Sequence, residues 1–107
     1  MNSAAPLICN MDVFTPAQRE AHIRTTTALI QSVQGVREVQ NGYEFTFPGE
    51  TEFISRVAEF ISSERACCPF LKFGLTVFSE EEPITFSLTG PAGTQEFLRI
   101  EFDGAIK

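Results

Sequence analysis

The side chains best suited to chemistry in this 107-residue sequence are three cysteines, two of which, Cys67 and Cys68, are adjacent and directly precede Pro69. Thiolates bind soft metal and metalloid ions such as Hg(II), As(III) and Cu(I), and they also bind Zn(II). Two thiolates suffice for linear Hg(II), and Cys9 would complete the three that suit trigonal As(III). The cysteines therefore predict a site for a soft metal or metalloid ion.

Tetrahedral zinc needs a fourth ligand, and His22 and Glu64 are the nearest candidates in the sequence. His22 lies about six residues into its predicted helix, roughly 9 Å along the helix axis, so the direction of its side chain decides whether it reaches the cysteine pair. Two arginines, Arg19 and Arg65, are predicted to stabilise an ionised thiol, together with the positive N-terminal end of the first helix.

A second interpretation of the cysteine pair is that it only packs in the core. Free cysteine is among the most often buried residue types and behaves as a small hydrophobe. Cys68 follows Val57, Ile61 and Glu64 at helical spacing, which would direct it into the core. Cys9 is open to the same interpretation. The sequence leaves the functional and the packing role open.

Two helices are predicted from capping residues and apolar periodicity. The first covers about residues 16–34, where Thr15 and Gln18 are spaced for a capping box. The second starts near Thr51 and ends at or just before the cysteine pair, because Pro69 disfavours helical geometry at the residue that precedes it. The cysteines are thus expected at a corner of the fold.

Turn signals and alternating apolar residues predict the strands. The dipeptide Asn41-Gly42 favours a two-residue hairpin turn. Period-two alternation then places strands at 36–40, 43–47, 71–77 and 84–89. The short apolar segment Leu7-Ile8-Cys9 would make a first strand. Residues 94–103 fit a helix, but the same residues also alternate like a strand.

This order, βαββαββα, predicts an α+β fold in which two or three helices cover an antiparallel sheet of four to five strands, as in ferredoxin-like proteins. One domain is expected to span residues 1–107, with residues 1–6 disordered. In a ferredoxin-like sheet the first and fourth strands are antiparallel neighbours, so Cys9 would approach Cys67 and Cys68. The fold therefore predicts one site shared by three cysteines.

Composition narrows the function classes. The formal charge of -6 and the pI near 4.7 oppose nucleic-acid binding, which normally relies on a basic surface. No apolar run approaches the roughly 20 residues of a membrane helix, and the N-terminus lacks the pattern of a signal peptide. An odd number of cysteines favours free thiols over disulfides, and the expected location is the reducing cytoplasm. Eleven phenylalanines predict a core built largely on that residue.

A longer pattern in the sequence resembles a family of small uncharacterised bacterial proteins. The resemblance rests on the stretch Glu64-Arg65-Ala66-Cys67-Cys68-Pro69-Phe70, together with Cys9, Arg19, His22 and the stretch Asn41-Gly42-Tyr43-Glu44-Phe45. It implies that the early cysteine, arginine and histidine share a site with the later cysteine pair. It implies no activity, because the family has no known function.

Three functions are compatible with these residues. The first is a small protein that binds a soft metal or metalloid ion through Cys67, Cys68 and Cys9. The second is a thiol-based redox enzyme in which one cysteine attacks and Cys9 resolves, with His22 or Arg65 stabilising the thiolate. The third is a ligand-binding or oligomerising module, for instance a homodimer or a binder of an apolar small molecule, whose cysteines only pack.

Overall fold

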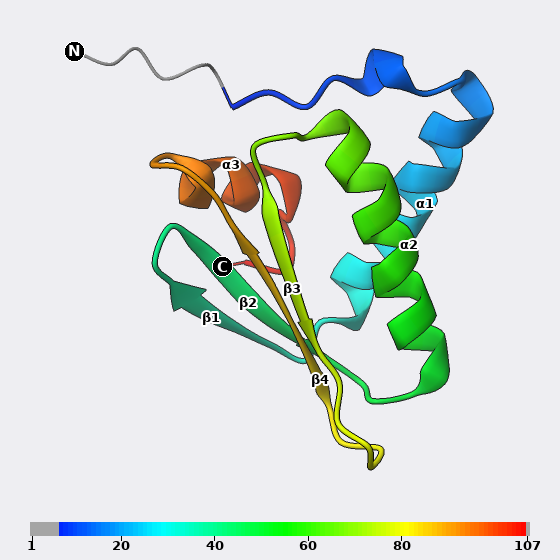
Figure 1. Cartoon of the computed structure of the whole chain (residues 1–107), viewed down its shortest axis with the longest axis vertical. Helices are drawn as coiled ribbons and strands as arrows, with labels where there is room; N and C mark the ends of the chain where they lie inside the picture. The colour runs from blue at the N-terminus through cyan, green and yellow to red at the C-terminus, as the bar shows by residue number, and fades with distance from the viewer. Residues whose placement is uncertain (1–6, 107) are drawn as a thin grey trace.

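The computed structural model describes residues 7–106, so the disorder expected for residues 1–6 lies outside the described part of the chain. The elements in chain order are η1 (Met11–Val13), α1 (Pro16–Ser32), β1 (Gly35–Val39), β2 (Gly42–Phe47), α2 (Thr51–Cys67), β3 (Lys72–Thr76), β4 (Ile84–Thr89) and α3 (Thr94–Glu101). Helices α1 and α2 lie side by side next to the sheet, and α3 packs on β2 (Figure 1).

Helix α1 begins where the sequence predicts it. The Gln18 N–H donates to Thr15 Oγ1 at 3.1 Å, and the Thr15 N–H donates to Gln18 Oε1 at 2.9 Å. This capping box satisfies two N–H groups at the start of the helix, where backbone donors lack helical partners. The helix then carries His22 and Leu29 into the interior.

All strands of the four-stranded sheet pair antiparallel, in the order β1-β2-β4-β3. The turn between β1 and β2 is the predicted one. Asn41 has a φ of 58°, a left-handed conformation that asparagine tolerates better than most residues. The next residue, Gly42, lies so close to β4 that a Cβ atom would overlap the Leu88 carbonyl. Few residue types therefore fit at these two adjacent positions of the hairpin.

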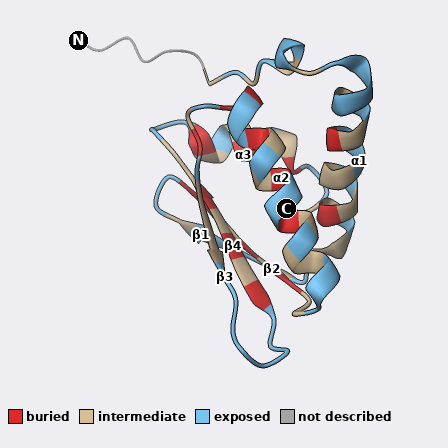
Figure 2. Ribbon diagram, turned by 45° about the vertical axis from the view of Figure 1, so that its right-hand side comes forward, coloured by how far each residue is buried: buried red, intermediate tan, exposed pale blue. Residues whose placement is uncertain are grey.

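The helices cover one face of the sheet, and the core lies between the two layers (Figure 2). Alternate residues of β2 and β4 are buried in it, namely Tyr43, Phe45, Phe47, Ile84, Phe86 and Leu88. Phe60 of α2 lies among aromatic rings, because its own ring contacts those of His22, Phe86 and Phe102. The core is therefore built on phenylalanine, as the composition predicts.

The α+β class, the antiparallel sheet and an element order that roughly matches the ferredoxin-like arrangement are confirmed. Thr94–Glu101 form a helix, so the strand alternative for this stretch is wrong. The strand expected at Leu7-Ile8-Cys9 is also wrong, since these residues have no regular structure. The reason is that β4 pairs with β2 on one edge and β3 on the other, and so takes the place beside β3 that the first strand would have used.

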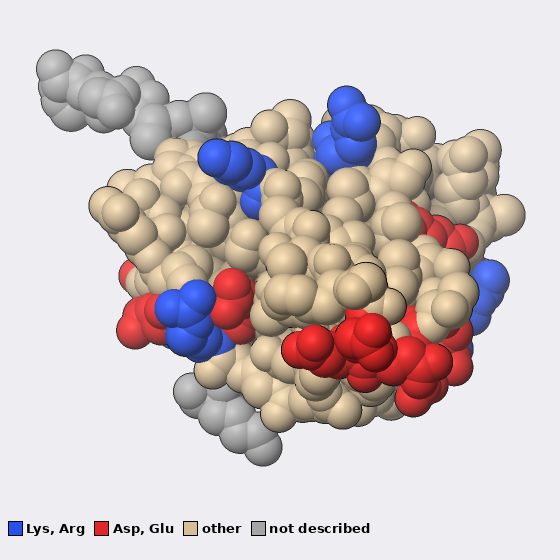
Figure 3. All heavy atoms as spheres, turned by 60° about the horizontal axis from the view of Figure 1, so that its bottom comes forward, with Lys and Arg blue, Asp and Glu red and all other residues tan. Residues whose placement is uncertain are grey.

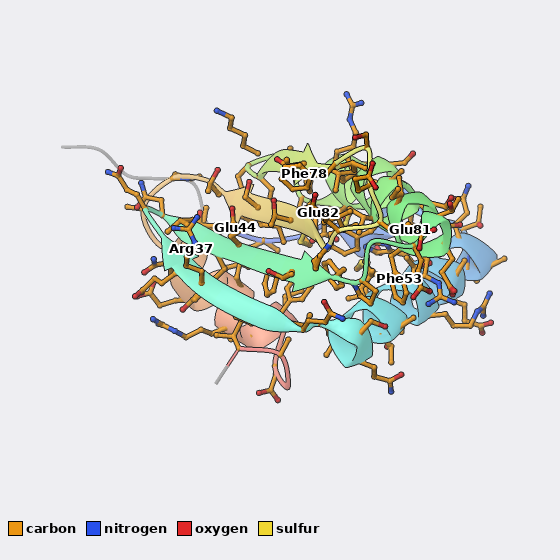
Figure 4. The ribbon with its side chains drawn as sticks, turned by 90° about the horizontal axis from the view of Figure 1, so that it is seen from below. Arg37, Glu44, Phe53, Phe78, Glu81 and Glu82 are labelled. Atoms are coloured by element: carbon orange, nitrogen blue, oxygen red, sulfur yellow. A yellow bond between two sulfur atoms is a disulfide. The ribbon has the colours of Figure 1, made fainter. Side chains whose placement is uncertain are left out.

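The surface of the sheet carries charged side chains at both of its ends. Arg37 and Glu44 are cross-strand partners that form an ion pair, with two guanidinium nitrogens 3.0 and 3.1 Å from Glu44 Oε1 (Figure 4). The turn between β3 and β4 has three exposed acidic residues, Glu80, Glu81 and Glu82. Figure 3 brings this end of the molecule forward and shows acidic side chains gathered there. Within residues 7–106, no helix is both long enough and apolar enough to cross a membrane.

Candidate functional site

The cysteine pair lies at a corner of the fold, and α2 ends inside the pair. Cys67 is the last helical residue, and Cys68 is the C-cap, whose N–H donates to the Glu64 carbonyl at 2.7 Å. Pro69 follows and has no N–H with which to extend the helix. Both cysteines are buried. The predicted corner is therefore confirmed, and it faces the interior.

Cys9 reaches the pair without forming a strand. The N–H of Asn10 donates to the Cys67 carbonyl at 2.8 Å, which fixes the N-terminal segment against the end of α2. Cys9 and Cys68, whose Cα atoms are 4.4 Å apart, are joined by a disulfide, and Cys67 remains free. The expectation of three free thiols is wrong, because an odd cysteine count does not prevent two cysteines from pairing once the fold brings them together.

The free thiol of Cys67 lies in electronegative surroundings. Its Sγ is 3.6 Å from Cys68 Sγ and 3.8 Å from Glu64 Oε1. Burial, followed by the negative charges of Glu64 and Glu101, raises the pKa of Cys67 to about 12. The sulfur is thus a neutral thiol at physiological pH unless a cation replaces its proton.

His22 belongs to the same cluster, because its side chain points toward the end of α2 and so reaches Glu64 and Cys67. Its Nε2 is 2.7 Å from Glu64 Oε1, and both side chains are buried. Side chains on a helix tilt toward its N-terminus, which directs the His22 ring toward the end of α2. The rings of Phe14 and Phe60 flank it at 5.5 and 5.4 Å between centroids. Burial lowers the pKa of His22, so the neutral ring donates its Nε2–H to Glu64.

A sixth residue, Glu101 at the end of α3, completes the cluster. The pKa of Glu101 is raised to about 9, mainly by burial. A hydrogen bond with Glu64 and repulsion by the charge of Glu64 also raise it. The protonated Glu101 donates to Glu64, whose pKa is raised by burial and lowered in turn by hydrogen bonds from Glu101 and Cys67. Glu64 therefore lies at the centre of the cluster, where it contacts an imidazole, a thiol and a second carboxyl group.

The sequence reasoning missed Glu101, although a signal for it exists. In a helix, Thr94, Leu98 and Glu101 occupy positions i, i+4 and i+7 on one face, and Thr94 and Leu98 are buried. In the alternative strand, Glu101 would point away from the apolar side. Because the choice between helix and strand was open for 94–103, the face on which Glu101 lies was open as well.

A cavity of about 250 Å³ opens onto the cluster. Its lining includes Cys9, His22, Glu64, Cys67 and Glu101 of the cluster, and α1 adds Thr26 and Thr27 as well as the apolar Ile23 and Ile30. A small ion therefore has space beside the buried donors, at a place that combines charged and apolar walls.

The two arginines that were predicted to stabilise a thiolate lie elsewhere. Arg19 Nη2 is 3.4 Å from the Met11 carbonyl oxygen and 3.8 Å from Asp12 Oδ1, so this guanidinium holds the N-terminal segment. Arg65 is exposed and borders a separate hollow together with Cys68 and Lys72. The charges that act on the free thiol are those of the carboxylates, which oppose its ionisation.

The donor atoms of the cluster form three overlapping groups, and within each group all atoms lie within 4.8 Å of one another. The groups are Cys9, Cys67 and Cys68; Cys9, Glu64, Cys68 and Glu101; and His22, Glu64 and Cys67. Three buried atoms of the cluster, His22 Nδ1, Glu64 Oε2 and Glu101 Oε1, have no hydrogen-bond partner among the described residues apart from a proton shared between the two carboxyl groups. Buried polar atoms normally have partners, so these atoms indicate a place for a proton or a cation.

The geometry does not match that of an activated nucleophile. Such a thiol hydrogen-bonds to a base, most often an imidazole, which takes its proton. Here Glu64 lies between His22 and Cys67, and the imidazole Nε2 is bonded to the carboxylate instead. The arrangement is therefore better suited to hold a cation than to attack a substrate.

No protein-family model matches the chain, and neither a curated protein nor a solved structure matches it significantly.

Proposed function

We propose that this protein binds a soft or borderline metal ion through Cys9, His22, Glu64, Cys67 and Cys68, and that Zn(II) fits this donor set best. The observation that carries the proposal is the group His22, Glu64 and Cys67, whose donor atoms lie within 4.8 Å of one another and whose side chains are all buried. Zinc accepts nitrogen, oxygen and sulfur ligands together, whereas Hg(II) and As(III) favour sulfur.

The distances between donors are close to the edges of a tetrahedral zinc site. Zn–S bonds of about 2.3 Å and Zn–O bonds of about 2.1 Å place two sulfurs about 3.8 Å apart, and a sulfur and an oxygen about 3.6 Å apart. The distances here are 3.6 Å from Cys67 Sγ to Cys68 Sγ and 3.8 Å from Cys67 Sγ to Glu64 Oε1. His22 Nε2 and Glu64 Oε1, at 2.7 Å, would separate to about 3.4 Å once a metal replaces the proton between them.

Thiol redox catalysis is less well supported than metal binding. Reactive cysteines lie in electropositive, partly exposed surroundings that lower the pKa of the thiol. Cys67 is buried beside two carboxyl groups, and burial and these groups raise its pKa. The thiolate of Cys67 is therefore disfavoured unless a cation binds to it. A cation in the cavity would compensate the negative charges that make Cys67 a poor nucleophile.

A role in packing alone is also less well supported. Packing does not account for a buried histidine and a buried glutamate beside the cysteines, since burying a charge is costly unless it is paired. The stretch Glu64-Arg65-Ala66-Cys67-Cys68-Pro69-Phe70, which carries the family resemblance, supplies three of the proposed ligands. Because cysteine ligands must be reduced, we place the metal-bound protein in a reducing compartment such as the cytoplasm.

Titration of the fully reduced protein with Co(II), followed by displacement with Zn(II), tests the proposal. We expect one ion per chain, with the intense sulfur-to-cobalt absorption of thiolate ligation and the visible bands of a tetrahedral site. Parallel titrations with Hg(II) and arsenite decide between a mixed site and a sulfur-only site, because only the mixed site weakens when His22 is changed to Ala. A folded, reduced protein that binds none of these ions would overturn the proposal.

A further inference from the structure

We infer that the disulfide between Cys9 and Cys68 is a redox gate on the proposed metal site, closed when oxidised and open when reduced. The inference rests on the proposed function, because it concerns access of a metal to the same ligands. The disulfide contributes sulfurs to two of the three donor groups, one with Cys67 and one with Glu64 and Glu101. Its state therefore decides how many sulfur ligands the site can offer.

Oxidation removes two thiolate ligands from the site. The thiolate is the form of cysteine that binds metal, and a disulfide sulfur carries no charge to replace it. With the disulfide intact, the remaining donors are His22, Glu64 and Cys67. Reduction adds two thiols at the edge of the same cluster, and one of them is enough to give four-coordinate zinc its fourth ligand.

The site is held in place by contacts that do not depend on the disulfide. The Asn10 N–H donates to the Cys67 carbonyl at 2.8 Å, and Arg19 Nη2 donates to the Met11 carbonyl at 3.4 Å. The Cys68 N–H is bonded to the Glu64 carbonyl at 2.7 Å. Because these bonds fix the backbone on both sides of the disulfide, the released thiols stay close to Cys67 after reduction.

The reductant that fits this geometry is a small thiol that approaches through the cavity. Cys9 is partly exposed and lines the cavity, whereas Cys68 is fully buried. The external thiolate attacks Cys9 Sγ and forms a mixed disulfide, and Cys68 leaves as a thiolate. A second small thiol attacks the mixed disulfide, so that Cys9 becomes a thiol and the small thiols leave as their own disulfide. Two electrons pass from two small thiols to the protein disulfide.

Cys67 does not compete with the external thiol, although its sulfur is 3.6 Å from that of Cys68. Attack by Cys67 on Cys68 would join neighbouring residues in a strained eight-membered ring. The disulfide therefore opens toward the cavity, and Cys67 stays available as a metal ligand.

The gate is tested by measuring Zn(II) affinity, in competition with a chromophoric chelator, for oxidised and reduced wild-type protein. We expect the reduced form to bind at least about 100-fold more tightly, since a released thiolate completes the set of four ligands. The matched variant Cys9→Ser cannot form this disulfide, and its affinity should be equal before and after mild oxidation, with two free thiols verified by mass spectrometry. Thermal melting of both wild-type forms establishes that each is folded.

The outcomes separate the gate from the proposed function. If the reduced, folded protein binds no metal, the proposed function fails and the gate fails with it. If both redox forms bind with the same affinity, the gate alone is wrong. The native protein is also incubated with excess reduced glutathione. A disulfide that opens only after the protein is denatured is a structural crosslink. This result would also overturn the gate.

Discussion

Nε2 of His22 lies 2.7 Å from Oε1 of Glu64, although the two residues are 42 positions apart in the chain. The bond joins α1 to α2 in the interior, and the same carboxyl group is 3.8 Å from the Cys67 sulfur. Glu64 is therefore the residue through which the imidazole and the thiol are connected. A carboxylate in this position serves as a hydrogen-bond acceptor without a metal and as a ligand with one.

Changing Glu64 to Gln removes the negative charge of the cluster while preserving the shape of the side chain. We expect Zn(II) affinity of the reduced protein to fall by about 100-fold, because the amide is a poor ligand and no longer compensates the charge of the ion. The matched control is Glu59→Gln, an exposed glutamate on the same helix, which should leave affinity unchanged. Equal Zn(II) affinities of the two variants would show that Glu64 is not a metal ligand.

Zn(II) affinity should increase with pH. The raised pKa values of Cys67, about 12, and Glu101, about 9, mean that a bound metal displaces protons that these groups hold at neutral pH. Affinity should rise about tenfold per pH unit for each proton released. Calorimetry in two buffers of different ionisation enthalpy counts the protons directly, and a count of zero would contradict the proton assignment.

Glu101 should make the metal-free protein less stable as pH rises. Its pKa is raised from 4.5 to about 9 in the folded state, so between these values the folded protein holds a proton that the unfolded chain has lost. The free energy of unfolding then decreases with increasing pH across this range, and the contribution is complete only below the unfolded pKa. Urea denaturation at pH 5 and pH 8 should show a smaller decrease for Glu101→Gln than for wild type.

Other groups near Glu101 titrate as well, and the comparison between variants accounts for them. Glu64, with a raised pKa, acts in the same direction, whereas His22, with a lowered pKa, favours the folded state as pH rises. Both groups are present in wild type and in Glu101→Gln. A pH dependence that is identical in the two proteins would show that Glu101 is not the proton carrier.

Truncation of Phe60 should destabilise the protein more than truncation of Phe78. Its side chain is fully buried and stacks near the His22 ring, so Phe60→Ala leaves a cavity that costs about 3–5 kcal/mol of unfolding free energy. Phe78 is 48% exposed in the turn after β3 (Figure 4), and Phe78→Ala should change stability by about 0.5 kcal/mol or less. Chemical denaturation measures both values. Similar losses of unfolding free energy for the two variants would contradict the central position of Phe60 in the core.

Gly42 tests the pairing of the two hairpins. A Cβ atom at this position would lie 1.9 Å from the Leu88 carbonyl oxygen, so Gly42→Ala must push β2 and β4 apart and should cost about 1–3 kcal/mol. Gly35 offers the matched control, since a Cβ there would make only ordinary contacts with Thr46 at 3.8 Å or more. We expect Gly35→Ala to be tolerated, as measured by thermal melting.

Local patterns in the sequence determined most of the secondary structure. The capping box at Thr15 and Gln18, the turn at Asn41-Gly42 and the end of α2 before Pro69 all act within a few residues, and each lies where it was predicted. The same local reasoning put the cysteine pair at a corner. The approach of Cys9 to the pair was also expected, although the first strand on which that expectation relied does not form and the disulfide was not foreseen.

Tertiary structure alone decided how the members of the cluster are bonded to one another and that Glu101 joins them. The disulfide, the bond between His22 and Glu64 and the approach of Glu101 from the last helix all join residues that are far apart in the sequence. Periodicity states which side of a helix a residue occupies, but not which residue of another element it will meet. The ionisation of these groups depends on the same packing, since burial and neighbouring charges set each pKa.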